Sequence, residues 1–127
     1  MFSHVFVGTN DLAAAKRFYD AIFAVTGVGE GYCVPDGPCV YRSETGTFAV
    51  SKPINGEPAC HANGGTIGFM MKSPEMADAW HAAGVAHGGT SCEDSPGIRE
   101  TPMGALYLAY LRDPDGNKLC AFFPMPG

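Results

Sequence analysis

Hydrophobic and polar residues alternate near the N-terminus and then change to helical spacing. The run "HVFVGTN" is rich in β-forming residues and predicts a strand that starts at His4. In the following "DLAAAKRFYDAIFA", apolar residues recur every three or four positions, which predicts an amphipathic helix with one buried face. Asp11 is a suitable N-cap for this helix, and Gly27 is a suitable stop. Three short strand candidates follow and are separated by glycine, proline and the turn "SETG": "GYCV", "PCVYR" and "TFAVSK".

The same order of elements returns in the second half of the chain. "TIGFMMK" predicts a strand, and "SPEMADAWHAAG" predicts a helix with Ser73 as its N-cap, Pro74 at its first position and Gly84 as its stop. After a longer loop, "ALYLAYLR", the turn "DPDG" and "NKLCAFF" predict a final pair of strands. The apolar stripe of the second helix is predicted to consist of Met76, Ala79, Trp80 and Ala83.

The two halves can be laid over one another, which indicates a duplicated unit. A shift of 62 residues places the first strand and helix on the second set, so that Asp11 matches Ser73. A shift of 70 residues places "YRSETGTFAV" on "LRDPDGNKLC", so that Val50 matches Cys120. The sequence therefore predicts one domain over residues 1–127, built from a module of about residues 1–60 and a module of about residues 61–127.

One helix covers only one face of each module's sheet, so the bare faces of the two modules are expected to enclose a cavity. Alternation along a strand then assigns each side chain to the helix or to the cavity. Val5 and Val7 are expected to face the helix, whereas His4 and Phe6 face the cavity. In the second module the residues expected to face the helix are Ile67, Phe69 and Met71, and those expected to face the cavity are Thr66, Gly68 and Met70.

Composition narrows the range of partners. The net charge of −5, without a basic stripe, argues against a nucleic-acid surface. No apolar run reaches the length of a membrane span, and no signal peptide is visible at the N-terminus. Five scattered cysteines do not match the paired spacing of structural zinc sites, and they favour reduced thiols in a cytoplasmic protein.

The segments "SHVFVGTNDLAAAKRFYDAIF" and "YLRDPDGNKLCAFF" resemble the vicinal oxygen chelate superfamily over essentially the whole chain. This superfamily includes glyoxalase I, extradiol dioxygenases, and bleomycin- and fosfomycin-resistance proteins. The resemblance implies an α+β fold in which two βαβββ modules form a curved, mostly antiparallel eight-stranded sheet around a cavity. It also implies a homodimer, because members commonly pair modules within or between chains.

Metal-dependent members carry His, Glu or Gln ligands on the first and last strands of each module. The resemblance places these positions at His4, Val50, Thr66 and Cys120, of which only His4 is a usual ligand. The set lacks both the metal cage and the carboxylate base of glyoxalase chemistry, so we expect neither that activity nor a bound cofactor. A divalent metal held by His4 together with a loop residue such as His61 is the alternative.

Cys120 has two interpretations. It is either a small buried hydrophobic residue beside Phe122, which we favour, or a nucleophile activated by His4 across the cavity. The candidate catalytic residues are therefore His4 and Cys120.

Arg99, in the extra loop "SPGIRETPMG", is a candidate contact for an anionic ligand. Tyr107 and Tyr110 point to opposite faces of one strand, and the sequence does not say which face is concave. Arg42, which precedes the first turn, is interpreted as a solvated strand end. The predicted substrate-binding residues are Phe6, Thr66, Met70, Arg99, Tyr110 and Phe122.

Two functions follow from these observations. The first is a glyoxalase-like cytoplasmic protein that acts on or binds a small metabolite between the modules, with lyase- or isomerase-type chemistry if it is an enzyme. The second is a metal-free binding protein that sequesters a small molecule, as bleomycin-resistance proteins do. The absence of carboxylates at positions 50 and 120 favours the second function, whereas His4 favours the first.

Overall fold

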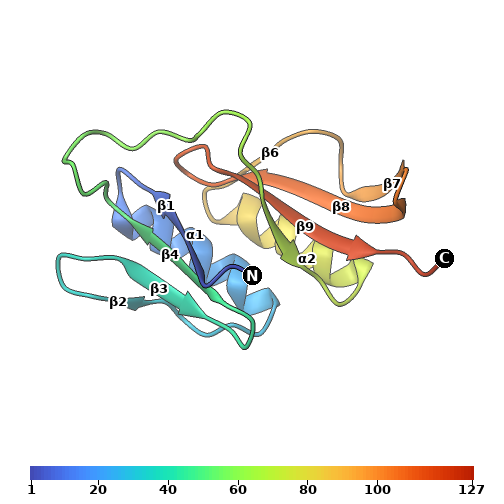
Figure 1. The fold of residues 1–127 in the computed structure, drawn as a ribbon, viewed down its shortest axis with the longest axis horizontal. Coiled ribbons are helices and arrows are strands. Elements are labelled where there is room, and N and C mark those ends of the chain that lie inside the picture. The colour runs from blue at the N-terminus through green and yellow to red at the C-terminus, as the bar shows by residue number, and fades with distance from the viewer.

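The computed structural model describes all 127 residues and contains two modules with matching element order (Figure 1). The first module consists of β1 (His4–Gly8), α1 (Leu12–Val25), β2 (Tyr32–Cys33), β3 (Cys39–Arg42) and β4 (Thr47–Ser51). The second module consists of β5 (Ile67–Met70), α2 (Pro74–Ala86), β6 (Thr90–Ser91), β7 (Gly97–Thr101), β8 (Gly104–Arg112) and β9 (Lys118–Pro124). Neither helix has the length and apolar character needed to cross a membrane.

Each module forms its own mixed sheet. The strand order is β1-β4-β3-β2 in the first sheet and β5-β9-β8-β6 in the second, with β7 also paired to β8. In both sheets the first and last strands of the module run parallel, and the other pairs are antiparallel. The prediction of two βαβββ-like modules in an α+β fold is confirmed. The prediction of one eight-stranded sheet is wrong, because β1 and β5 do not pair and the sheets remain separate.

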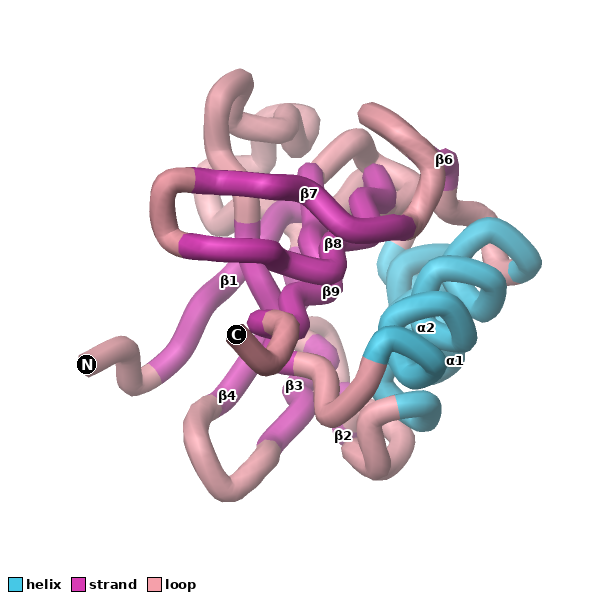
Figure 2. The backbone as a smooth tube through the Cα atoms, turned by 90° about the vertical axis from the view of Figure 1, so that its right-hand side faces the viewer, coloured by secondary structure: helices cyan, strands magenta, loops and turns pink.

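Side chains, instead of backbone hydrogen bonds, join the two modules. Both helices lie together on one side of the molecule and the strands lie on the other (Figure 2). The ring of Phe69 on β5 packs against Phe48 of β4 and Phe23 of α1, with centroid distances of 5.7 and 5.2 Å. One hydrophobic core therefore extends across both modules, although neither sheet continues into the other.

The helix ends show where local signals predicted the structure correctly. Asp11 accepts a hydrogen bond from the backbone N–H of Ala14, and Ser73 accepts one from the N–H of Met76, as expected for N-caps. Gly84 is not the stop that its position predicted, because α2 continues to Ala86. Gly84 is buried, and it permits close packing against the second sheet and α1. In the predicted apolar stripe, Ala79 is exposed, and the buried alanine is instead Ala77.

Part of the extra segment of the second module, which the sequence predicted as a loop, is a strand. Residues 97–101 form β7, which pairs antiparallel with the first half of β8. β6 pairs with the other end of β8, so β6 and β7 share the same edge of that strand.

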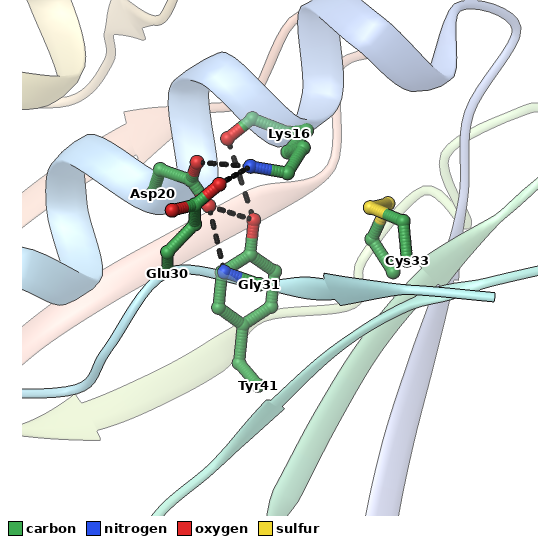
Figure 3. Close-up of a disulfide and its surroundings, with 7 residues drawn as sticks. Lys16, Asp20, Glu30, Gly31, Cys33 and Tyr41 are labelled. Carbon is green, nitrogen blue, oxygen red and sulfur yellow. Dashed lines mark hydrogen bonds and ion pairs between the residues drawn. A yellow bond between two sulfur atoms is a disulfide. The ribbon is translucent and has the colours of Figure 1, made fainter.

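Two of the five cysteines form a disulfide, which corrects the prediction that all the thiols are reduced. Cys33 and Cys39 are directly opposed on β2 and β3 and are joined through their sulfur atoms (Figure 3). A sequence separation of six residues does not by itself predict this bond, because it depends on the hairpin register that brings the Cα atoms within 3.9 Å. Cys60, Cys92 and Cys120 remain free thiols.

A polar network next to this hairpin ties α1 to the strands (Figure 3). The Asp20 carboxylate accepts hydrogen bonds from Lys16 Nζ at 2.6 Å, the Tyr41 hydroxyl at 2.7 Å and the backbone N–H of Gly31 at 3.0 Å. Burial alone would raise the pKa of Asp20, but these hydrogen bonds outweigh it and lower that pKa. Gly31 cannot carry a side chain here, since an added Cβ would lie 2.5 Å from the Tyr41 ring.

Candidate functional site

The bare face of the first sheet carries His4 and Phe6. Their rings meet edge to face with centroids 5.7 Å apart, and both side chains are exposed. Val5 and Val7 pack against the core on the opposite face, as the alternation predicted. On β5, Met70 is exposed, whereas Ile67 and Phe69 pack against the core.

The bare face of the second sheet carries a small apolar cluster around Cys120. Cys120 is 6% exposed and lies directly across from Tyr110 on β8. Tyr107 lies on the other face, where its hydroxyl donates a hydrogen bond to Asp78 of α2 at 2.6 Å. The structure therefore answers the question that the sequence left open, because Tyr110 is on the face away from the helices. The members of this cluster are Leu106, Leu108, Tyr110, Cys120 and Phe122.

The Cys120 thiol lacks the environment of an activated nucleophile. Burial raises its pKa, so the neutral thiol predominates at neutral pH. The thiol donates to the backbone carbonyl of Ala121 at 3.4 Å, whereas His4 Nδ1 is hydrogen-bonded to Ser3 Oγ at 2.8 Å. No hydrogen bond joins His4 to Cys120, which lie on different sheets. These observations support the packing interpretation, and a catalytic role for either residue stays a prediction.

Thiol alkylation provides a direct test of Cys120. At neutral pH we expect iodoacetamide to modify Cys120 at least about tenfold more slowly than the exposed Cys60, because Cys120 is buried and its pKa is raised. The rate is measured for each site by peptide mass spectrometry, with Cys120→Ala as the assignment control. Faster alkylation of Cys120 than of Cys60 would restore the nucleophile hypothesis.

The predicted match between Val50 and Cys120 is wrong by one residue. Val50 is fully buried on the helix face of β4. In the strand registers, Phe6 pairs with Ala49 in the first module just as Gly68 pairs with Cys120 in the second. The cause is the turn length, because four residues separate Arg42 from Thr47 and five separate Arg112 from Lys118. Ala49 therefore occupies the family position that the sequence assigned to Val50, and its side chain also lacks an atom that could bind a metal ion.

The residues at the four family positions do not fit a metal ion. These positions hold His4, Ala49, Thr66 and Cys120, and only histidine and cysteine among them are usual metal ligands. Elsewhere, too, the protein has no group of three or more His, Cys, Asp or Glu side chains that could hold an ion. The alternative ligand His61 lies beside Gly116. Gly116 belongs to the turn of residues 113–117, which contacts Gly8 at the C-terminal end of β1. His61 is therefore not a partner for His4 at the start of that strand.

Arg99 lies on the cluster side of the second sheet, opposite Leu106 of β8. Its guanidinium donates hydrogen bonds to the backbone carbonyls of Asp94, Ser95 and Gly97 at 3.0–3.1 Å. These bonds hold the segment between β6 and β7. Much of its donor capacity is therefore used within the chain, and a contact between Arg99 and an anionic ligand stays a prediction.

A cavity of about 310 Å³, here called the junction pocket, opens where the first module meets β5. The start of β1, the end of α1, the turn of residues 43–46 and β5 form its walls. Arg42 also lines it, and its side chain is exposed at the end of β3, as expected for a solvated strand end. Of the predicted cavity residues, the pocket contains His4, Gly68 and Met70 but not Phe6, Thr66, Arg99, Tyr110, Cys120 or Phe122.

Comparison with known proteins agrees with this architecture. The family model described as Glyoxalase/Bleomycin resistance protein/Dioxygenase superfamily matches residues 1–121. The chain is 57% identical to a glyoxalase/bleomycin resistance protein of Albidiferax ferrireducens T118, with 96% of this chain and 98% of that one covered and a TM-score of 0.93. A search of curated proteins gave no significant match.

More distant solved structures share the fold. A glyoxalase-related enzyme of Fulvimarina pelagi is 19% identical, with 97% of this chain and 87% of that one covered and a TM-score of 0.75. A lactoylglutathione lyase of Agrobacterium tumefaciens is 21% identical, with 96% and 92% covered and a TM-score of 0.66.

Proposed function

Because the chain belongs to the glyoxalase/bleomycin resistance protein/dioxygenase superfamily, we propose that it binds a small metabolite in the junction pocket without a metal ion. One observation carries this proposal: the pocket between the modules contains His4 as its only metal-ligating side chain. A volume of about 310 Å³ is at the lower end of the range for ligand pockets, so it suits a small metabolite.

Catalysis is the second candidate function, and His4 favours it. His4 is the only histidine of the pocket, and imidazole is the commonest general acid or base, so lyase- or isomerase-type chemistry would depend on it. The structure offers no carboxylate in the pocket to act as a second acid or base.

A homodimer belongs to the same proposal. Phe6 and Met70 are 53% and 67% exposed on the bare sheet faces, and a second copy of the chain is the partner that we propose for them. A cytoplasmic location is also proposed, and the Cys33–Cys39 disulfide is an argument against it, because cytoplasmic proteins usually keep their cysteines reduced.

Metal analysis together with native mass spectrometry tests the proposal. Protein purified without added metal is expected to contain far less than one equivalent of nickel, zinc, iron or manganese per chain, and to keep its fold in EDTA. A metabolite retained in native spectra, and lost when Gly68→Leu fills the pocket wall, would support binding there. Near-stoichiometric metal that disappears in His4→Ala would overturn the metal-free proposal.

A further inference from the structure

The two ends of the module junction differ, although the modules correspond to each other. At one end, the turn of residues 113–117 in the second module is bonded to the first module. Asn117 Nδ2 donates to the carbonyl of Gly8 at 3.1 Å, and the N–H of Asn10 donates to Asp115 Oδ1 at 2.8 Å. The Tyr19 hydroxyl of α1 donates to Asp113 Oδ2 at 2.5 Å. This end of the junction is therefore closed by polar contacts between the modules.

The corresponding end in the first module is open. The turn of residues 43–46 makes hydrogen bonds only within itself, between Ser43, Thr45 and Gly46. No hydrogen bond joins this turn to the second module, and the junction pocket lies at this position. The turn of residues 43–46 has four residues, whereas the turn of residues 113–117 has five. The longer turn reaches the other module, and the shorter turn leaves the junction pocket open at the corresponding position.

Two corresponding arginines show the same difference. Arg112 Nη1 donates to the carbonyl of Gly116 in its own turn at 2.7 Å. Arg42 occupies the equivalent strand end, but its guanidinium has no hydrogen-bond or salt-bridge partner in the protein, and Ser43 is the donor to the Gly46 carbonyl instead. Arg42 is exposed, and it lines the junction pocket as well as a neighbouring groove that also contains Glu30.

Apart from Arg42 and His4, the wall of the pocket consists of apolar and uncharged polar residues. Phe23, Phe48 and Phe69 provide aromatic surface, and Thr26 and Thr47 provide hydroxyl groups. The chain carries a net charge of −5, yet no Asp or Glu side chain lines this pocket. An anion placed beside Arg42 would therefore meet a bidentate donor and no repelling carboxylate in the wall.

We propose that the junction pocket binds a small carboxylate with an apolar body, whose carboxylate group is held by Arg42 and whose body contacts Phe23 and Phe69. This inference rests on the proposed function and adds the chemical class of the ligand.

A matched pair of probes tests the inference. 3-Phenylpropionate and 3-phenylpropionamide have the same apolar body, but only the first is an anion. They are titrated into the intact protein, and binding is followed by amide chemical shifts in ¹⁵N-labelled protein. We expect the carboxylate to shift the amides of Thr47 and Gly68 and to bind at least about tenfold more tightly than the amide, as for a hydrogen bond to a charged group. Arg42→Met should remove this difference, whereas Arg17→Met, which removes the same charge from an exposed position of α1, should leave it unchanged.

The outcomes separate the two proposals. Equal affinity of the two probes, or a preference that survives in Arg42→Met, overturns the carboxylate inference while pocket binding stands. Shifts confined to the cluster around Cys120 overturn it as well, since the anion then binds elsewhere. No shift with either probe up to its solubility limit counts against both proposals.

Discussion

Replacement of Gly84 by valine is expected to destabilise the protein by about 3 kcal/mol, because no space exists for a side chain there. An added Cβ would lie 2.3 Å from Leu111 Cδ1, 3.2 Å from the Phe18 ring and 3.3 Å from Ile22 Cγ2. These atoms belong to β8 and α1, so the extra methyl groups of valine would separate α2 from both neighbours. The free energy of unfolding is measured by urea denaturation of the variant and the natural protein.

Ala82→Val is the matched control, because Ala82 lies on the exposed face of the same helix. This substitution should lower the free energy of unfolding by about 0.5 kcal/mol, which is the difference in helix propensity between alanine and valine. A Gly84→Val variant no less stable than Ala82→Val would mean that α1 and α2 do not approach each other as closely as the structure describes.

Gly84 also shows what the sequence can and cannot predict. Apolar spacing and N-caps placed the starts of both helices correctly, because these signals lie within about four residues of one another. Whether a glycine ends a helix or provides room for a neighbour depends on contacts with distant residues such as Leu111. Local pattern alone therefore assigned Gly84 the commoner role of a stop.

The candidate site was predictable to the level of strand faces. Alternation placed His4, Phe6 and Met70 on the bare faces, as the structure shows, whereas the family resemblance placed Cys120 there. The match of Val50 to Cys120 was wrong because it was counted across a turn that is one residue shorter in the first module. A shift of one residue along a strand moves a side chain to the opposite face of the sheet.

The junction pocket could not be predicted, because it results from a contact that fails to form. Arg42 and Arg112 look equivalent in the sequence, and only the structure shows that the guanidinium of Arg112 is bonded within its turn whereas that of Arg42 is not. The difference in turn length was the available signal.

Replacement of Asp113 by alanine is the second change with a large expected effect, of about 3 kcal/mol or more. The Asp113 carboxylate is 3% exposed and accepts four hydrogen bonds, all between 2.5 and 2.9 Å. Alanine would leave the donors of the turn and the buried Tyr19 hydroxyl without an acceptor. Burial, with the neighbouring Asp113 charge, raises the pKa of Tyr19 well above its ordinary value, so Tyr19 remains a donor across the accessible pH range.

A double-mutant cycle separates the contact between the modules from the turn itself. Tyr19→Phe removes one of the four hydrogen bonds to Asp113 and should lower the free energy of unfolding by about 2 kcal/mol. As a control, Glu44→Ala in the corresponding turn of the first module should lower it by less than about 0.5 kcal/mol, because Glu44 is exposed. Coupling between Tyr19 and Asp113 should exceed about 1 kcal/mol. Faster amide exchange at Asn10, which donates to Asp115 in the same turn, should accompany the loss of Asp113. Additive effects with unchanged exchange would show that the turn folds independently of α1, and the closed end of the junction would then lose its explanation.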